Sequence, residues 1–275
     1  MPETPFGREL KVGSWEEFEA QLRELRAASI NASHPLLYRG QPDASWSLTT
    51  TLERATSGRY PVRKYYRLIR KIRPQIETFT ESDWPLPEVK DIENALNEFD
   101  FGIELLKGNF LGYHYMMYLR HHGFPAPLLD WSRSPYVAAY FAFRQSVTSA
   151  REVAIYVFNE WPTDLKSRGS DKPTIYSLGQ YVRSHKRHFL QQSMYTMCII
   201  YDTRSVPKEW HFSRHDKVFE EGRPDQDLLA KIIIPSSQRM TFLRRLEEFN
   251  LSAFSLFGSE ESLMETLAVR ELDLS

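Results

Sequence analysis

The spacing of apolar side chains divides the chain into helical and extended segments. Residues 15–28 and 62–80 carry apolar side chains three or four positions apart, which predicts two amphipathic helices, the first with Ser14 as its N-cap. Ser134 and Pro135 are typical of a helix start and precede a further apolar run. The same spacing predicts additional helices at residues 88–107, 111–120, 237–249 and 259–270.

Short apolar runs predict the extended segments. Leu36, Leu37 and Tyr38 form the first run, which is expected to enter a turn at Arg39 and Gly40. Later strands are expected at residues 153–158, 197–201, 228–234 and, last, 251–257. Helices gather in the first half of the chain and strands in the second, so an α+β fold is favoured over a regular βαβ alternation.

The length of the chain favours one large unit. With 275 residues it can build a hydrophobic core that needs no disulfide or metal support. We expect a helical N-terminal segment at residues 1–33 and a main domain at residues 34–275, packed together as a single globular unit.

Cysteine content and hydropathy bear on the cellular compartment. The single cysteine, Cys198, excludes an intramolecular disulfide, and its apolar neighbours predict a buried thiol. The first ten residues have no apolar run typical of a signal peptide, and no segment is apolar enough to cross a bilayer. A cytoplasmic protein with no membrane partner is therefore expected.

Basic residues form two local clusters, although the net charge of the chain is only −1. Six of the eleven residues from 63 to 73 are basic. This segment fits either the solvated face of an amphipathic helix or a track for RNA or DNA phosphates, with Tyr66 stacked on a base. The second cluster, at residues 183–188, would suit a polyanionic substrate. The candidate nucleic-acid contacts are Arg63, Lys64, Arg67, Arg70, Lys71, Arg183, Lys186 and Arg187.

Three motifs resemble those of the FRG-domain family. The tripeptide YRG at residues 38–40 matches the motif that names the family, and residues 121–143 (HHGFPAPLLDWSRSPYVAAYFAF) resemble its central signature. Residues 187–196, with an arginine and a Gln-Gln-Ser run, resemble a later element. The chain departs from the pattern at Ala126 and Pro127, where many members carry Thr-Arg.

The FRG pattern is in turn similar to that of ADP-ribosyltransferases, a likeness at the level of fold. It implies a split mixed sheet, with helices inserted between the first strand and the later strands. It also implies NAD as a substrate without a metal, and Arg39, Asp130 and Gln192 as catalytic residues. The residues that the resemblance places against NAD are Tyr38, Arg39, Gly40, Trp131 and Ser132.

These residue types suit that chemistry, because breaking the bond between nicotinamide and ribose creates an oxocarbenium-like transition state. Arg39 can grip the pyrophosphate, and the glycine after it lets a ligand approach the backbone. Asp130 can stabilise the cation or hold Arg39. Trp131 or Tyr38 can stack on nicotinamide, and Gln192 can hydrogen-bond the ribose.

Structural roles explain the same residues, and these alternatives stay open. Arg39 and Asp130 can form a buried ion pair between the first strand and the central segment. Trp131 suits the core better than a ligand stack, Ser132 can cap a helix, and the glutamines can satisfy backbone groups. Glu152 is, with Glu160, a further candidate for the third catalytic position.

Two histidine pairs are candidates for metal binding or for acid–base catalysis. His211 and His215 lie four residues apart, as metal ligands on a helix do, but without a third ligand solvated side chains are favoured. His121 and His122 precede a glycine in an expected loop and can act as general acid or base.

The leading hypothesis is an ADP-ribosyltransferase-like enzyme that transfers ADP-ribose from NAD to a nucleic acid, with RNA preferred. It would act as a bacterial toxin or anti-phage effector, restrained by an antitoxin or inhibitor protein. The alternative is a non-catalytic FRG module that binds a nucleotide or a nucleic acid.

Overall fold

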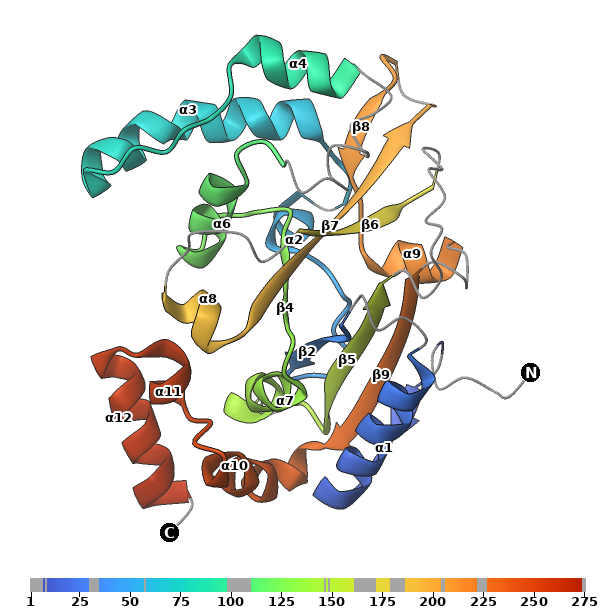
Figure 1. Ribbon diagram of the computed structural model, residues 1–275, viewed down its shortest axis with the longest axis vertical. Coiled ribbons are helices and arrows are strands. Elements are labelled where there is room, and N and C mark those ends of the chain that lie inside the picture. The colour runs from blue at the N-terminus through green and yellow to red at the C-terminus, as the bar shows by residue number, and fades with distance from the viewer. Residues whose placement is uncertain are drawn as a thin grey trace.

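One sheet connects nearly all parts of the chain. The computed structural model describes residues 7, 9–29, 35–56, 58–97, 110–145, 147, 149–160, 172–178, 186–203, 206–221 and 227–273. Within these residues nine strands form the sheet, in the order β1-β9-β5-β2-β4-β7-β8-β3 with β6 added to β7 (Figure 1). The strands are β1 (Glu9–Lys11), β2 (Leu37–Gln41), β3 (Tyr60–Pro61), β4 (Leu129–Ser132), β5 (Glu152–Glu160), β6 (Thr174–Leu178), β7 (Ser193–Asp202), β8 (Glu209–Phe212) and β9 (Asp227–Pro235).

Helices gather at the two ends of the sheet. Figure 1 shows α3 and α4 at one end and α10, α11 and α12 at the opposite end. No helix in the described part of the chain is long and apolar enough to cross a membrane. The helices are α1 (Trp15–Ala28), α2 (Thr51–Thr56), α3 (Val62–Thr80), α4 (Val89–Asn97), α6 (Tyr113–His121), α7 (Pro135–Arg144), α8 (Lys186–Leu190), α9 (Asp216–Glu221), α10 (Arg239–Glu248), α11 (Ala253–Phe257) and α12 (Glu260–Ala268), with short turns η1 (Ser236–Gln238) and η2 (Val269–Asp273).

The strand directions make the sheet a mixed one. β1 runs parallel to β9, whereas β5 runs antiparallel to both β9 and β2, and β4 antiparallel to β7. Of the helices that the structure describes, α2, α3, α4 and α6 lie in the chain between β2 and β4. The predicted α+β class is therefore confirmed, with a mixed sheet.

Alternation along the strands builds a core on each face of the sheet. On β5, Val153, Ile155 and Val157 pack with residues of α1, α7 and α10. Tyr156 and Phe158 point to the opposite face, where they pack with β4, β9 and α9. A third apolar cluster joins α3, α4 and α6 to β6, β7 and β8. Strand-period alternation thus gives each face of the sheet an apolar surface against which other elements pack.

The sheet forks at β7. Tyr195 pairs with Asp130 of β4 and with Leu178 of β6, so β4 and β6 lie on opposite edges of β7. Farther along, Ile199 pairs with both β6 and β8. β4 and β8 therefore share one edge of β7, one after the other.

Helices with strong periodicity and caps lie where the sequence predicts them. α1 and α3 have the predicted bounds, and the Ser14 hydroxyl accepts a hydrogen bond from Glu17 N at 3.2 Å. α7 begins at Pro135, where the Ser134 hydroxyl accepts from Val137 N at 3.3 Å. The predicted helix at 88–107 is confirmed as α4 up to residue 97, and its remainder lies outside the described residues.

Two predicted elements are wrong. Arg39 and Gly40 do not form a turn, because β2 continues through them and pairs with β5 along its whole length. Residues 251–257 do not form a strand, because Ser252 starts α11 with a capping box: its hydroxyl accepts from Ser255 N at 3.4 Å, and the Ser255 hydroxyl accepts from Ser252 N at 3.0 Å. The sequence did not predict β1, β6, β8 or α8, which are all short.

Gly40 is required by packing between α7 and β2. A Cβ atom at this position would lie 1.9 Å from Ala138 O and 2.6 Å from Ala142 N. The sequence assigns Gly40 to close approach of a ligand, but the backbone of α7 makes the close approach instead. This contact seats α7 on the strand that carries Arg39.

We predict that Gly40→Ala destabilises the protein, because the added methyl group must displace helix backbone. The free energy of unfolding from urea denaturation should fall by about 1–3 kcal/mol or more. Gly13→Ala is the matched control, since its Cβ would meet its nearest neighbour, Glu17 Oε2, at 3.6 Å. That variant should stay within about 0.5 kcal/mol of the wild type. Equal stability of the two variants would contradict the proposed packing constraint.

Candidate functional site

The candidate site opens where β2 and β4 separate. The two strands pair at Tyr38 and Ser132, and their ladder ends there. An antiparallel register continued from that pair would set Gly40 opposite Asp130. Because β2 remains paired with β5 and β4 with β7, the backbone groups that face this gap need other partners.

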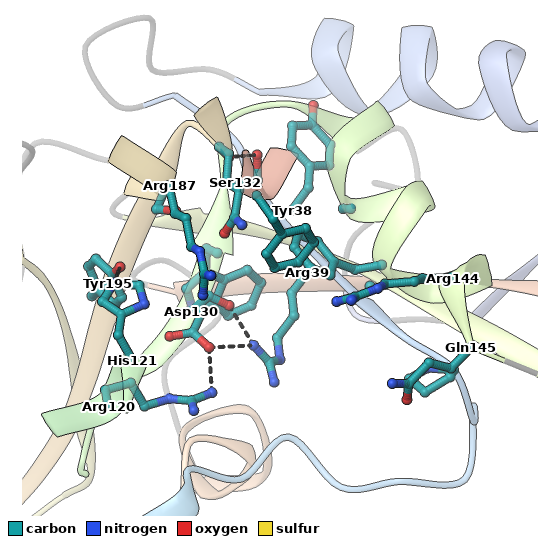
Figure 2. A pocket seen from close by; sticks show the side chains of 18 of the residues that line it. Tyr38, Arg39, Arg120, His121, Asp130, Ser132, Arg144, Gln145, Arg187 and Tyr195 are labelled. Carbon is teal, nitrogen blue, oxygen red and sulfur yellow. Dashed lines mark hydrogen bonds and ion pairs between the residues drawn. The ribbon is translucent and has the colours of Figure 1, made fainter. Parts of the chain in front are cut away.

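The Arg39 side chain bridges the gap. Its Nη1 donates to the backbone carbonyl oxygen of Asp130 at 2.7 Å and lies 3.8 Å from Asp130 Oδ2. Arg120, from the end of α6, pairs with the same Oδ2 (Figure 2). One carboxylate thus holds two guanidinium groups, and the cluster carries a net positive charge.

Both guanidinium groups are largely withdrawn from water. The Arg39 and Arg120 side chains are 17% and 20% exposed. Burial lowers the pKa of Arg39 to about 10, Asp130 opposes that shift, and Arg120 and Arg54 add to it. Arg39 therefore stays protonated at neutral pH but is poorly solvated, so an anionic ligand would stabilise it.

Several polar atoms of this cluster have unused hydrogen-bonding capacity. Within the described residues, Nε of Arg39, Nε of Arg120 and Oδ1 of Asp130 are buried and have no hydrogen-bond partner. Buried polar groups in folded proteins are normally paired, and a catalytic role is one explanation for an exception. The cluster therefore fits a site that gains contacts when a ligand binds.

A pocket of about 410 Å³ lies over this cluster. This volume falls within the range of small-molecule sites, about 300–1,000 Å³. Its walls come from β2, β4, α6, α7, α8, β7 and α11. The charged residues that line it are Arg39, Arg120, Arg144, Arg187 and Asp130.

Arg144 and Arg187 line the pocket next to Phe257 of α11. The guanidinium carbons lie 4.3 and 5.4 Å from the centroid of the Phe257 ring. Arg144 also forms a bidentate pair with Glu265 of α12, with both N–O distances 2.6 Å. Helices α11 and α12 therefore fix the direction of this arginine.

An imidazole faces the pocket beside a buried phenol. His121 Nε2 lies 2.8 Å from the Tyr195 hydroxyl, and His121 ends α6 rather than lying in a loop as predicted. Burial, followed by the charge of Asp130, raises the pKa of Tyr195, so its hydroxyl keeps its proton and can donate to His121. On the other side, His188 stacks on the Tyr195 ring at 5.8 Å, and burial lowers the pKa of His188.

Three of the predicted NAD contacts, Tyr38, Trp131 and Ser132, are buried. Tyr38 and Trp131 contribute to the lining, but both side chains are buried in the core. The Trp131 indole N–H donates to Thr196 Oγ1 at 2.8 Å, so its role is structural. The Ser132 hydroxyl donates to the Gln191 carbonyl oxygen at 2.7 Å and accepts from Ser134 N at 3.0 Å. It therefore ties β4 to the turn that precedes β7.

Gln191, and not Gln192, lines the pocket. Gln192 is exposed and has a left-handed backbone (φ 48°) in the turn between α8 and β7. The Gln191 amide donates to the Leu256 carbonyl oxygen at 3.1 Å, which joins this turn to α11. Because of this turn, the Gln192 side chain is exposed and Gln191 takes the place at the pocket that the motif match gives to Gln192. Glu160 accepts from Ser177 N at 3.0 Å and, like Glu152, does not line the pocket.

Trp46 was missed by the sequence reasoning. It lines the pocket, and its side chain is an exposed large apolar group in the loop after β2. No recognised motif covers this loop. Its only sequence signal is an aromatic residue among the polar residues Asp43, Ser45 and Ser47.

The prediction that His211 and His215 are solvated side chains is wrong for His215. His211 lies on β8, whereas His215 is fully buried before α9 and does not share a helix face with it. His215 Nε2 contacts Thr196 Oγ1 at 3.0 Å, and its Nδ1 lies 3.9 Å from Glu53 Oε1. Among the described residues, no three His, Cys, Asp or Glu side chains are grouped so that they could hold a metal ion.

The basic helix α3 is only partly available to a nucleic acid. Glu93 of α4 lies 3.0 Å from Arg63 and 3.7 Å from Arg67, and Arg70 donates to a backbone carbonyl oxygen. Lys64 and Lys71 remain exposed. The predicted stacking of Tyr66 on a base is wrong, because the ring is buried and its hydroxyl donates to the Leu111 carbonyl oxygen at 2.7 Å.

The second basic cluster is described in part. Arg187 lines the pocket. Arg183 lies outside the described residues, and the side chain of Lys186, at the start of α8, is also outside them.

Comparison with known families identifies part of the chain. Residues 34–151 match the model of the FRG domain. The chain contains an FRG domain. No curated protein and no solved structure matches the chain.

The FRG domain match ends before the pocket is complete. It covers β2, α6, β4 and α7, which supply Arg39, Arg120, Asp130 and Arg144. Arg187 and the other residues from α8, β7 and α11 lie beyond it. The residues that match the FRG domain and residues that follow the match therefore build the pocket together.

We predict that Asp130→Asn destabilises the protein, because two poorly solvated guanidinium groups then lack a counter-charge. The free energy of unfolding should fall by about 1–3 kcal/mol. This loss is smaller than for a fully buried ion pair, because the Asp130 side chain is 38% exposed. Inorganic pyrophosphate should restore part of the loss in a thermal-unfolding assay.

The matched control for this prediction is Glu93→Gln. Glu93 is 37% exposed and also contacts two arginines, but on the surface of α3. It should change stability by less than about 1 kcal/mol and show no added response to pyrophosphate. Equal behaviour of the two variants would show that the charge cluster has no special role.

Proposed function

We propose that this FRG-domain protein is an ADP-ribosyltransferase-like enzyme that transfers ADP-ribose from NAD to a nucleic acid, with RNA as the preferred acceptor. The observation that carries the proposal is the pocket of about 410 Å³ that is lined by four arginines and one aspartate. NAD carries a doubly anionic pyrophosphate and planar rings, and arginine is the side chain best suited to grip phosphate oxygens.

In this proposal, Arg39 and Arg120 bind the pyrophosphate. Both come from rigid elements, β2 and α6, and the Asp130 carboxylate holds both in place. The anion stabilises guanidinium groups that burial has already separated from water. Little side-chain order is then lost on binding, which favours affinity.

The chemical step breaks the bond between the nicotinamide nitrogen and C1′ of the ribose. The electron pair leaves with nicotinamide, and the positive charge that develops on the ribose is stabilised by the Asp130 carboxylate. An oxygen or nitrogen atom of the acceptor then forms the new bond to C1′. The proton that the acceptor loses passes to His121, an imidazole that lines the pocket.

A polyanionic acceptor suits the charge of this region. The arginines around the pocket outnumber the single lining carboxylate. A nucleic acid can therefore approach the site that binds NAD without a dominant repulsive charge. An enzyme that consumes NAD and modifies RNA would be harmful to its own cell. We therefore include a bacterial toxin or anti-phage role, with an antitoxin or inhibitor as partner.

We predict that the purified protein releases nicotinamide from labelled NAD and transfers the label to total RNA. Arg39→Ala should lower transfer by about 100-fold or more, because it removes a charged group from the transition state. Arg23→Ala, at an exposed arginine of α1, is the matched control and should keep the wild-type rate.

Three results would decide between the alternatives. Absence of nicotinamide release by the folded wild type contradicts the enzyme. Binding of NAD or RNA without turnover supports the alternative, a non-catalytic FRG module. Full activity of Arg39→Ala contradicts the role of Arg39.

A further inference from the structure

Trp46 presents an aromatic surface at the pocket. Its side chain is 48% exposed and is the exposed large apolar residue among those that line the pocket. Tyr38 and Trp131, the predicted stacking residues, are buried. A half-exposed indole that lines a positively charged pocket has the properties of a platform for a planar ring.

The loop that carries Trp46 is held by hydrogen bonds on both sides. Trp46 N donates to the Asp43 carbonyl oxygen at 3.2 Å, and the Tyr156 hydroxyl donates to the Trp46 carbonyl oxygen at 3.2 Å. Ala44 N donates to Glu152 O at 2.9 Å, which ties the loop to β5. The backbone under the indole is therefore fixed before any ligand binds, so stacking would order few further groups.

Positive charge continues from the pocket toward this loop. Arg54 of α2 is exposed, and its Nη1 donates to the Thr49 carbonyl oxygen at 2.8 Å, at the end of the loop that carries Trp46. Burial, followed by the charge of Arg120, lowers the pKa of Arg54, whereas Glu53 and Asp130 oppose that shift. Arg54 lies on the surface, and Arg120 and Arg39 line the pocket.

The loop also contains one acidic group. Asp43 Oδ1 accepts from Ser45 N at 2.8 Å and from the Ser45 hydroxyl at 2.6 Å. Its charge is partly satisfied within the loop, so it opposes an anionic ligand only weakly.

We propose that Trp46 and Arg54 form the acceptor subsite of the enzyme and bind single-stranded nucleic acid, with a base stacked on Trp46 and a flanking phosphate on Arg54. This inference rests on the proposed transfer to a nucleic acid and names its acceptor as unpaired. A duplex keeps the faces of its bases stacked, whereas a single strand exposes them to aromatic side chains.

The position of Trp46 favours the acceptor over the nicotinamide ring. The reacting ribose must lie next to Asp130 and His121 inside the pocket. Trp46 keeps about half of its surface in solvent, which leaves a strand stacked on it free to continue past the protein. This arrangement fits a long polymer better than the enclosed end of a dinucleotide.

The test is the binding of a short, fluorescently labelled single-stranded RNA, measured by polarisation without NAD. Trp46→Ala should raise Kd about 5- to 150-fold, the range for loss of one stacked base. Arg54→Gln should lower the slope of log affinity against log salt by roughly 0.7, one phosphate contact. The matched controls, Phe79→Ala on α3 and Arg23→Gln on α1, change exposed side chains and should bind as the wild type does.

Two further measurements distinguish loss of stacking from loss of the fold and from a preference for duplex. The complementary duplex should bind more weakly than the single strand, and thermal unfolding should show that all four variants fold. Equal affinity of Trp46→Ala and Phe79→Ala, or a preference for duplex, overturns the inference. Loss of binding in Trp46→Ala upholds it even if the wild type releases no nicotinamide, a result that contradicts only the proposed reaction.

Discussion

A single guanidinium group, that of Arg39, fills the place where two strands of the sheet stop pairing. The ladder between β2 and β4 ends at Tyr38 and Ser132, and Arg39 then donates across the gap to the Asp130 carbonyl oxygen at 2.7 Å. A backbone hydrogen bond of the sheet is replaced by a side-chain one. The gap becomes a pocket instead of a packed interior, and its floor carries a positive charge.

The surrounding elements keep that cation in position. Gly40 lets α7 pack directly on β2, and Arg120 shares the Asp130 carboxylate from α6. The ion pair therefore has two roles, since it ties β2 to β4 and also lines a cavity. The two interpretations that the sequence leaves open, a structural pair and a ligand site, are compatible in this geometry. Burial of the arginines makes the cluster a site that an anion would stabilise.

Local signals predicted the helices better than the strands or the pocket. Periodicity and caps define α1, α3 and α7, whereas β6 and β8 have only five and four residues and pair with β7, their neighbour in the chain. Arg39 and Asp130 could be identified from motifs. Trp46 and Arg120 could not, because only the tertiary fold brings them to the pocket. For Tyr66 the sequence predicted a ligand contact that the fold does not allow. Its position on a basic helix suggests stacking on a base, but its ring is buried and its hydroxyl donates to the Leu111 carbonyl oxygen.

The most direct test of this account is a crystal structure of the protein with ADP-ribose bound. We predict that a phosphate oxygen lies within about 3 Å of an Arg39 nitrogen, with Asp130 still holding Arg39 and Arg120. Such a structure would also show whether Arg144 and Arg187 contact the ligand. A ligand bound elsewhere, or a pocket whose arginines contact only protein atoms, would contradict the central claim.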